Sequence, residues 1–167
     1  ITRPGRCAVA TRGPSRYFGG DEALAALVHA RVDALLTERG WPGAAAVGVA
    51  DGPFAAGLAA ESAGGNGDGS VNRVQVVPAG ETAGFLAPLP VEALWGVGPK
   101  TAERLHGLGL HTIGDLARWP EADLGRRFGQ HGYDLARHAR GMDERPVVTE
   151  HEAKSISQET TFARDIS

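Results

Sequence analysis

The stretch Leu94-Trp95-Gly96-Val97-Gly98-Pro99-Lys100-Thr101-Ala102 decides how this chain is interpreted. Its two glycines permit backbone angles that other residues avoid, and Pro99 suits the first turn of a helix, where its missing N–H costs little. The free N–H groups at such a helix start, reinforced by the helix dipole, bind a phosphate oxygen. We therefore predict a helix-hairpin-helix element that binds a nucleic-acid backbone without reading the bases. The expected contact residues are Gly96, Val97, Gly98, Lys100 and Thr101.

A plain helical hairpin, in which the glycines only make the turn, is the alternative interpretation. A turn by itself requires neither the Pro-Lys-Thr that follows the glycines nor the tryptophan that precedes them. A second, paired element is expected at residues 110–116, and the apolar side chains of both halves are expected to form a shared core. This predicted core consists of Leu105, Leu108, Leu110, Ile113 and Leu116.

Short helices separated by Gly and Pro are predicted from residue 81 to residue 143, as a separate all-α unit. Thr112 and Asp115 have the spacing of a capping box, which starts a helix. Pro99 and Pro120 suit first-turn positions, and Gly141 suits a helix end. The expected helices are 81–86, 91–95, 99–106, 113–118, 120–128 and 132–140.

Residues 1–80 alternate between strand-like and helix-like patterns, which together with the helical unit predicts an α+β fold. Asp21 is a candidate N-cap of an amphipathic helix that ends near Gly40. The helix is indicated by Leu24, Leu27, Val28, Val32, Leu35 and Leu36, which recur near the helical period. Strands are expected at 7–11, 44–50 and 73–77, a turn at Gly13-Pro14, and a second helix at 54–60.

Segments with little apolar content are expected to connect the units. Residues 62–70, Ser-Ala-Gly-Gly-Asn-Gly-Asp-Gly-Ser, bury too little apolar area to offset their ordering, so they predict a mobile loop. Residues 142–153 are interpreted as a charged linker and residues 154–163 as the first strand of a further unit. The predicted domains are therefore 1–80, 81–143 and 144–167.

Composition limits the classes of function. The 167 residues are 42% hydrophobic with a net charge of −3, which is typical of a soluble globular chain. No apolar run approaches the roughly 20 residues that cross a bilayer, so we expect a cytoplasmic protein with no membrane partner. Cys7 is the single cysteine and the histidines lack metal-ligand spacing, so neither a disulfide nor a zinc site is expected.

Several stretches around the hairpin match a known family as a set. They are Phe85-Leu86-Ala87-Pro88-Leu89-Pro90-Val91, Leu94-Trp95-Gly96-Val97-Gly98, Thr101-Ala102-Glu103-Arg104-Leu105 and Ile113-Gly114-Asp115-Leu116. They resemble the thumb of the Y-family translesion DNA polymerases, close to the bacterial DNA polymerase IV group. Arg16-Tyr17-Phe18-Gly19 and Val47-Gly48-Val49-Ala50 are similar to the second half of that family's palm.

Residues 154–162, Lys-Ser-Ile-Ser-Gln-Glu-Thr-Thr-Phe, resemble the first strand of the same family's little finger. The resemblance therefore implies a fragment with the late palm, the thumb and the start of the little finger. It also implies that Lys154 and Ser155 contribute to DNA binding.

The resemblance further implies that residues needed for catalysis are replaced. The family transfers nucleotides with Mg²⁺ held by palm carboxylates, one outside this chain and two adjacent in a palm strand. Alignment without gaps from Arg16-Tyr17-Phe18-Gly19 places the adjacent pair on Gly5 and Arg6, and no acid precedes Asp21. Two lysines of active relatives, one expected to meet the incoming triphosphate, correspond to Pro53 and Gly57. We therefore expect no catalytic residue, metal ligand or cofactor in this chain.

The leading hypothesis is a non-catalytic Y-family scaffold, similar to the ImuB-like adaptor of bacterial mutasomes. It would bind damaged DNA without sequence preference during translesion synthesis and mutagenic repair in the SOS response. Its partners would be primer-template DNA and, through regions outside this chain, the sliding clamp, an error-prone replicative-type polymerase and a RecA-like accessory protein.

Three alternatives stay open from the sequence. The chain is a fragment of an active Y-family polymerase, a helix-hairpin-helix module of a nuclease or repair factor, or an interaction module with no nucleic-acid partner. The subfamily is also open, because residues 154–162 are closer to polymerase IV than to the adaptor.

Overall fold

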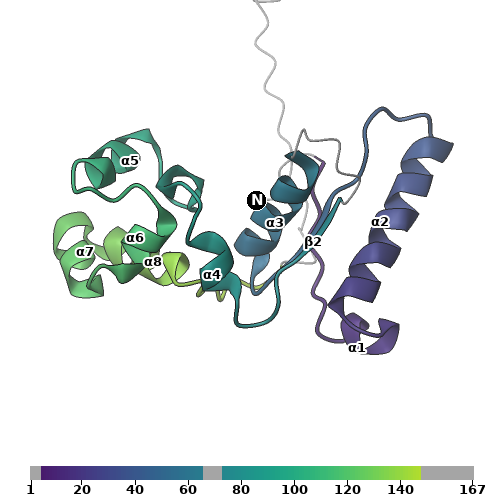
Figure 1. The fold of residues 1–167 in the computed structure, drawn as a ribbon, viewed down its shortest axis with the longest axis horizontal. Helices are drawn as coiled ribbons and strands as arrows, with labels where there is room; N and C mark the ends of the chain where they lie inside the picture. Colours follow the sequence, from purple (N-terminus) through teal and green to yellow (C-terminus); the bar gives the residue numbers. More distant parts are fainter. Residues whose placement is uncertain (1–4, 66–72, 148–167) are drawn as a thin grey trace, which may run out of the picture.

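The computed structural model describes residues 5–65 and 73–147, and its elements form two groups that follow each other along the chain (Figure 1). The N-terminal group consists of α1 (Pro14–Phe18), α2 (Asp21–Glu38), β1 (Val47–Val49), α3 (Pro53–Gly65) and β2 (Val74–Val76). The helical group consists of α4 (Thr82–Leu86), the 3₁₀ helix η1 (Val91–Ala93), α5 (Pro99–His106), α6 (Ile113–Arg118), α7 (Glu121–Phe128) and α8 (Gln130–Ala139). The predicted α+β class is confirmed.

A small parallel sheet organises the N-terminal group. Strands β1 and β2 pair with Val47 opposite Val74 and Val49 opposite Val76, and α3 is the crossover that joins them. Helix α3 lies very close to β1, because a Cβ on Gly48 would lie 2.1 Å from the carbonyl oxygen of Ala56. The predicted strands at 44–50 and 73–77 are confirmed, although both are shorter than expected.

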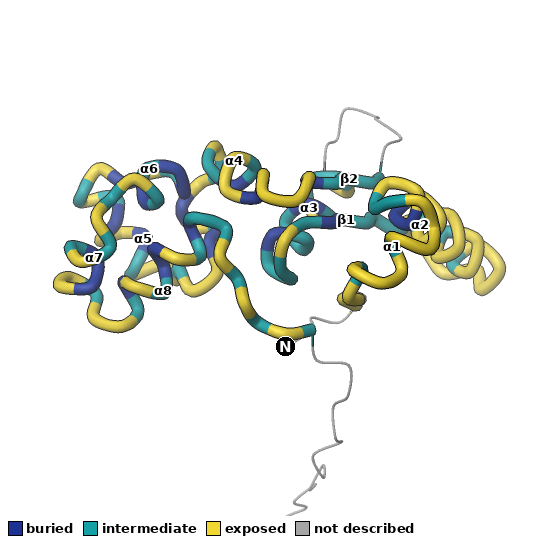
Figure 2. Tube along the Cα trace, turned by 90° about the horizontal axis from the view of Figure 1, so that it is seen from below, coloured by how far each residue is buried: buried dark blue, intermediate teal, exposed yellow. Residues whose placement is uncertain are grey.

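Helix α2 forms as predicted, but most of its apolar face is not buried. Leu24 and Ala25 are buried, whereas the side chains that follow them stay between 37% and 48% exposed. These exposed side chains are Leu27, Val28, Val32 and Leu35. Figure 2 shows the physical reason: the helix continues well past the short strands that it covers. Asp21 is the first helical residue, and Gly20 occupies the N-cap position in its place.

Three other predictions for the N-terminal group are corrected. The predicted strand at 7–11 is wrong: residues 7–10 are exposed coil, and they do not pair with either strand of the described sheet. The turn at Gly13-Pro14 leads directly into α1. Helix α3 continues to Gly65 through an alanine-rich sequence that favours helix, so residues 62–65 are not loop.

The apolar core of the helical group also includes Ala55 of α3, and Phe54 and Leu58 pack against it. Its buried segments are dark blue in Figure 2. Leu105, Leu110, Ile113 and Leu116 are at most 3% exposed and Leu108 packs against them, which confirms the predicted shared core. Two backbone hydrogen bonds join the entry segments of α5 and α6: Val91 N–H donates to the His111 carbonyl and Ile113 N–H to the Leu89 carbonyl, both at 2.9 Å.

The predicted helices of this group are confirmed with small shifts. Residues 91–93 form a 3₁₀ helix, α8 begins at Gln130 instead of 132, and Gly141 follows the end of α8 with φ of +77°. Pro99 is a first-turn residue, but Pro120 is the N-cap of α7. Within the described residues, no helix has the length and hydropathy needed to cross a bilayer.

Candidate nucleic-acid interface

The bend before α5 is held in place by Gly96 and by one internal hydrogen bond. Gly96 has φ of +93°, a left-handed conformation that side chains disfavour, and a Cβ there would lie 3.2 Å from His131 Cε1. The N–H of Val97 donates to the Leu94 carbonyl at 3.0 Å. The amide of Val97 is therefore engaged within the turn, and its role as a donor to phosphate stays a prediction.

Gly98 has a different role from Gly96. It is the N-cap of α5 with φ of −89° and ψ of 174°, angles that any residue adopts. A Cβ at this position would meet no atom within 4 Å. The expectation that both glycines are needed for unusual backbone angles is therefore correct only for Gly96, and Gly98 instead leaves the surface in front of α5 open.

The first amides of α5 have no acceptor in the described part of the chain. No side chain caps this helix, Pro99 has no N–H, and the first backbone bond that closes onto the N-cap runs from Ala102 N–H to the Gly98 carbonyl at 2.9 Å. The N–H groups at the helix start point along its axis into solvent. We call the N–H groups of Gly98, Lys100 and Thr101 the amide face.

The amide face lies at the surface of the molecule. Gly96, Gly98 and Lys100 are exposed, Thr101 is partly exposed, and the preceding Trp95 is 52% exposed. A groove of about 610 Å³ borders it, lined by Glu92, Val97, Gly98, Pro99, Ala102, Glu103 and His106. None of the described residues covers the bend, which leaves it accessible to a ligand within this part of the chain.

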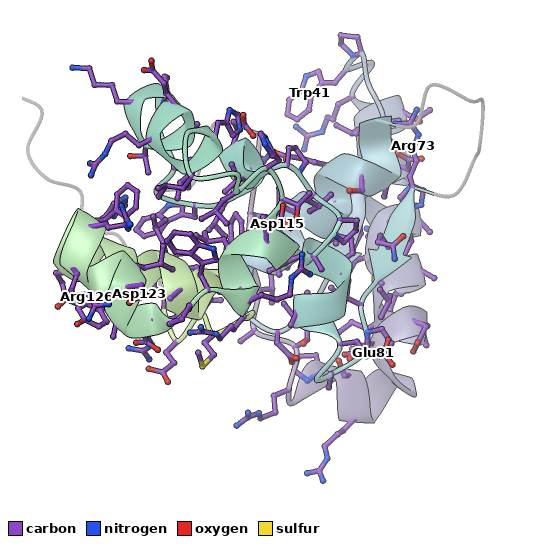
Figure 3. The ribbon with its side chains drawn as sticks, turned by 60° about the vertical axis from the view of Figure 1, so that its left-hand side comes forward. Trp41, Arg73, Glu81, Asp115, Asp123 and Arg126 are labelled. Atoms are coloured by element: carbon purple, nitrogen blue, oxygen red, sulfur yellow. The ribbon has the colours of Figure 1, made fainter. Side chains whose placement is uncertain are left out.

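Most cations of the helical group are engaged by the protein itself. Arg104 donates to the Arg127 carbonyl at 2.9 Å and stacks on Phe128, and Arg127 lies over Trp119. The remaining arginines are ion-paired: Arg118 with Asp115, Arg126 with Asp123, Arg137 with Glu144, Arg140 with Glu121 and Arg145 with Asp143. Figure 3 shows Asp123 and Arg126 side by side on α7. Among residues 81–147, Lys100 is the cation with neither an ion pair nor an aromatic partner.

Two of the four positions expected to correspond to catalytic residues, Arg6 and Gly57, lie close together. Arg6 forms an ion pair with Glu61 of α3, and its Nη1 lies 3.5 Å from where a Cβ on Gly57 would be. In the described ranges, no group of three or more His, Cys, Asp or Glu side chains could hold a metal ion. A guanidinium group repels Mg²⁺, so the residues present here do not suit that metal. Lys154 and Ser155 lie outside the described residues.

The sequence did not reveal a charged cluster next to the bend. Asp143 and Arg145, in the segment interpreted as a linker, form an ion pair with a shortest distance of 2.6 Å, and the Arg145 guanidinium lies 4.1 Å from the centre of the Trp95 ring. Trp95 and the opposite charges of Asp143 and Arg145 could be read from the sequence. Nothing in their spacing indicated that they meet.

Comparison with known proteins agrees with these features. The profile of the IMS family HHH motif matches residues 80–110, which include the bend and all of α5. The chain is 37% identical over 152 residues to a DNA polymerase IV of Desulfatibacillum aliphaticivorans, covering 91% of this chain and 36% of the relative. It is 45% identical over 121 residues to a DNA polymerase IV of Dehalococcoides mccartyi strain CBDB1, covering 72% and 30%.

A third relative, a DNA polymerase IV of Opitutus terrae, is 52% identical over 94 residues, covering 55% of this chain and 24% of the relative. The crystal structure of DinB from Sulfolobus solfataricus matches 57% of this chain and 27% of that one, with 23% identity and a TM-score of 0.44. The chain thus spans 24% to 36% of the length of these curated relatives. By the motif and by sequence similarity along most of its length, it belongs to the Y-family DNA polymerases.

Proposed function

We propose that this chain binds the sugar-phosphate backbone of duplex DNA at the amide face, without sequence preference. The observation that carries the proposal is the unpaired start of α5, where the N–H groups of Gly98, Lys100 and Thr101 meet solvent. A helix start of this kind favours an anion, and Lys100 adds a charge that is not paired within the group. Contacts to phosphate carry no base information, which accounts for the lack of sequence preference.

Binding of the chain to several duplexes of unrelated sequence tests this proposal. Gly98→Val places a branched side chain in front of the amide face, so it should weaken binding to all duplexes by the same factor. Gly84→Val is the matched control, because Gly84 also has open space around it but lies in α4. Losses that differ between sequences, or an equal loss in the control, would refute the proposal.

We also propose that the chain serves as a non-catalytic scaffold and that this part of the protein holds no Mg²⁺. The support is the chemistry at the expected metal-binding pair, where Gly5 offers no ligand and Arg6 is a cation paired with Glu61. The active-polymerase alternative is favoured by the relatives, which are named DNA polymerase IV.

Primer extension with Mg²⁺ and labelled nucleotides separates the two possibilities. The scaffold proposal expects no extension by the chain or by any longer protein that contains it. Extension that disappears when an acidic residue of this segment is mutated would overturn the proposal.

The remaining parts of the proposal rest on the family resemblance alone. They are a role in SOS-induced mutagenic repair, a cytoplasmic location, and binding to a sliding clamp, an error-prone replicative-type polymerase and a RecA-like protein. Co-purification of each candidate partner with tagged protein tests the interactions one at a time. A candidate that never co-purifies is removed from the proposal.

A further inference from the structure

Asp143 connects the segment after α8 with the first turn of α3. Its side chain is only 3% exposed. The carboxylate accepts hydrogen bonds from the Phe54 N–H at 3.2 Å, from Arg145 Nε at 2.6 Å and from Arg145 Nη2 at 2.7 Å. One buried carboxylate thus ties the N-terminal group to the helical group.

The turn before α3 fits closely against the same residue. Gly52 has φ of +90°, and a Cβ on it would lie 2.9 Å from the Asp143 Cβ and 3.0 Å from the Asp143 carbonyl oxygen. A side chain at position 52 would therefore push the segment away. The contact is a close fit of backbone and side chain as well as an electrostatic one.

Arg145 continues the connection to the bend. Its guanidinium lies 4.1 Å from the Trp95 ring centre, within the range of a cation–π contact. Trp95 also packs edge-to-face against His138 at 5.3 Å and directly precedes Gly96. A continuous chain of contacts therefore runs from Phe54 through Asp143 and Arg145 to Trp95, the residue directly before the bend.

The charges in this chain of contacts are stable at neutral pH. Burial raises the pKa of the Asp143 carboxyl, but the hydrogen bonds from Arg145 and from the Phe54 N–H outweigh burial and lower the pKa overall. The hydrogen bond to Asp143 raises the pKa of Arg145. The ion pair is bidentate, a geometry that lysine does not reproduce.

We infer that Asp143 and Arg145 are positioning residues for the DNA contact: they fix the orientation of the amide face relative to α3 through Trp95. The inference rests on the proposed function. A bend that is already ordered in the free protein binds DNA without an additional entropic cost of ordering. Loss of the Asp143–Arg145 pair therefore weakens binding even though every N–H donor to phosphate remains.

Asp143→Asn and Arg145→Gln test the inference in duplex binding as a function of salt. Both should weaken binding about fivefold while the slope of log K against log salt stays unchanged. Charge alone predicts the opposite result for Asp143→Asn, because loss of a negative charge strengthens binding to a polyanion. Arg126→Gln, which removes an exposed arginine of α7, is the charge-matched control for Arg145→Gln and should leave affinity nearly unchanged.

Two outcomes of this experiment overturn the inference. One is binding by Asp143→Asn that equals or exceeds the wild type. The other is a fall in the Arg145→Gln salt slope by about one unit, which would mean that Arg145 itself contacts a phosphate. Arg145→Lys should behave like Arg145→Gln, because lysine keeps the charge and loses the bidentate geometry.

Amide hydrogen exchange at Val97 and Ala102, whose N–H groups are hydrogen-bonded at the bend, provides an independent test when it is measured without DNA. Exchange there should become faster in Arg145→Gln than in Arg126→Gln, and equal rates would overturn the inference. If Asp143→Asn fails to fold in a thermal unfolding control, Arg145→Gln still decides the result. If the wild-type chain binds no duplex, the proposed function fails, and the exchange rates still decide whether Arg145 holds the bend.

Discussion

Thr112 and Asp115 bond to each other twice at the start of α6. Thr112 Oγ1 accepts from the Asp115 N–H at 3.0 Å, and Asp115 Oδ2 accepts from the Thr112 N–H at 2.9 Å. The N–H of His111 also donates to this carboxylate, at 3.2 Å. The amides at the start of α6 are therefore hydrogen-bonded within the protein, those of Ile113 and Gly114 to the carbonyls of Leu89 and Ala87. Helix α5, in contrast, begins at Gly98 with no side-chain cap. The two neighbouring helix starts therefore differ in how many free N–H groups they offer to a ligand.

Thr112→Val should remove the cap of α6 without touching the amide face. We expect the free energy of unfolding, measured by urea titration, to fall by about 1 kcal/mol, the usual cost of losing an N-cap hydroxyl. Duplex affinity of the folded variant should match the wild type. A loss of affinity in a fully folded variant would contradict the division between the two helix starts.

Gly96→Ala should destabilise the chain more than Gly98→Ala does. The left-handed φ of Gly96 and the nearby His131 ring strain any Cβ there, at a cost of about 1 to 2 kcal/mol. Gly98 has ordinary angles and open space, so its alanine variant should lose only the smaller preference for glycine over alanine at an N-cap, measured by thermal unfolding. Equal losses for both variants would show that the two glycines play the same structural role.

Local patterns explain why much of the helical group was predictable from sequence. The capping box joins residues three apart, and the core leucines recur at helical spacing, so both signals lie within a few residues. Whether residues 7–11 form a strand depends instead on a partner strand elsewhere in the chain. The local alternation of side chains does not indicate whether such a partner is present. That prediction failed for this reason.

The candidate site was predictable only in part, for a similar reason. The Gly-x-Gly-Pro sequence located the bend, but it could not distinguish a glycine needed for its φ from one that keeps a surface open. Asp143 and Phe54 lie 89 residues apart, so their contact follows from tertiary packing alone. The engagement of most arginines by acids and aromatic rings was equally invisible in a count of charges.

The stability of the chain should fall as the pH drops below neutrality because of His138. Burial lowers the pKa of His138 in the folded state, and the carboxylate of Asp143 only partly opposes this effect. A depressed folded-state pKa gives stability that is present above the unfolded pKa of about 6.5 and is lost as the pH falls through the folded value. Urea unfolding between about pH 7.5 and 5.5 measures the loss.

His138→Gln should reduce that pH dependence, whereas His111→Gln, a change at an exposed histidine, should retain it. Nδ1 of His138 is buried without a hydrogen-bond partner among the described residues, so no hydrogen bond offsets its burial. Identical pH profiles for His138→Gln and the wild type would assign the effect to another group.

Duplex binding by the chain should depend on salt more weakly than its number of arginines suggests. Each phosphate neutralised by a cation contributes about −0.9 to the slope of log K against log salt. The described arginines of the helical group are held by acids, a carbonyl or aromatic rings, so Lys100 is the cation available beside the amide face. We therefore expect a slope of log K against log salt between about −1 and −2. Lys100→Met should make the slope shallower by about one unit, while Arg126→Met should leave it unchanged. A steep wild-type slope, on the order of −5, would mean that the arginines leave their partners to bind DNA. The ion pairs of the free protein would then not predict which cations contact phosphate.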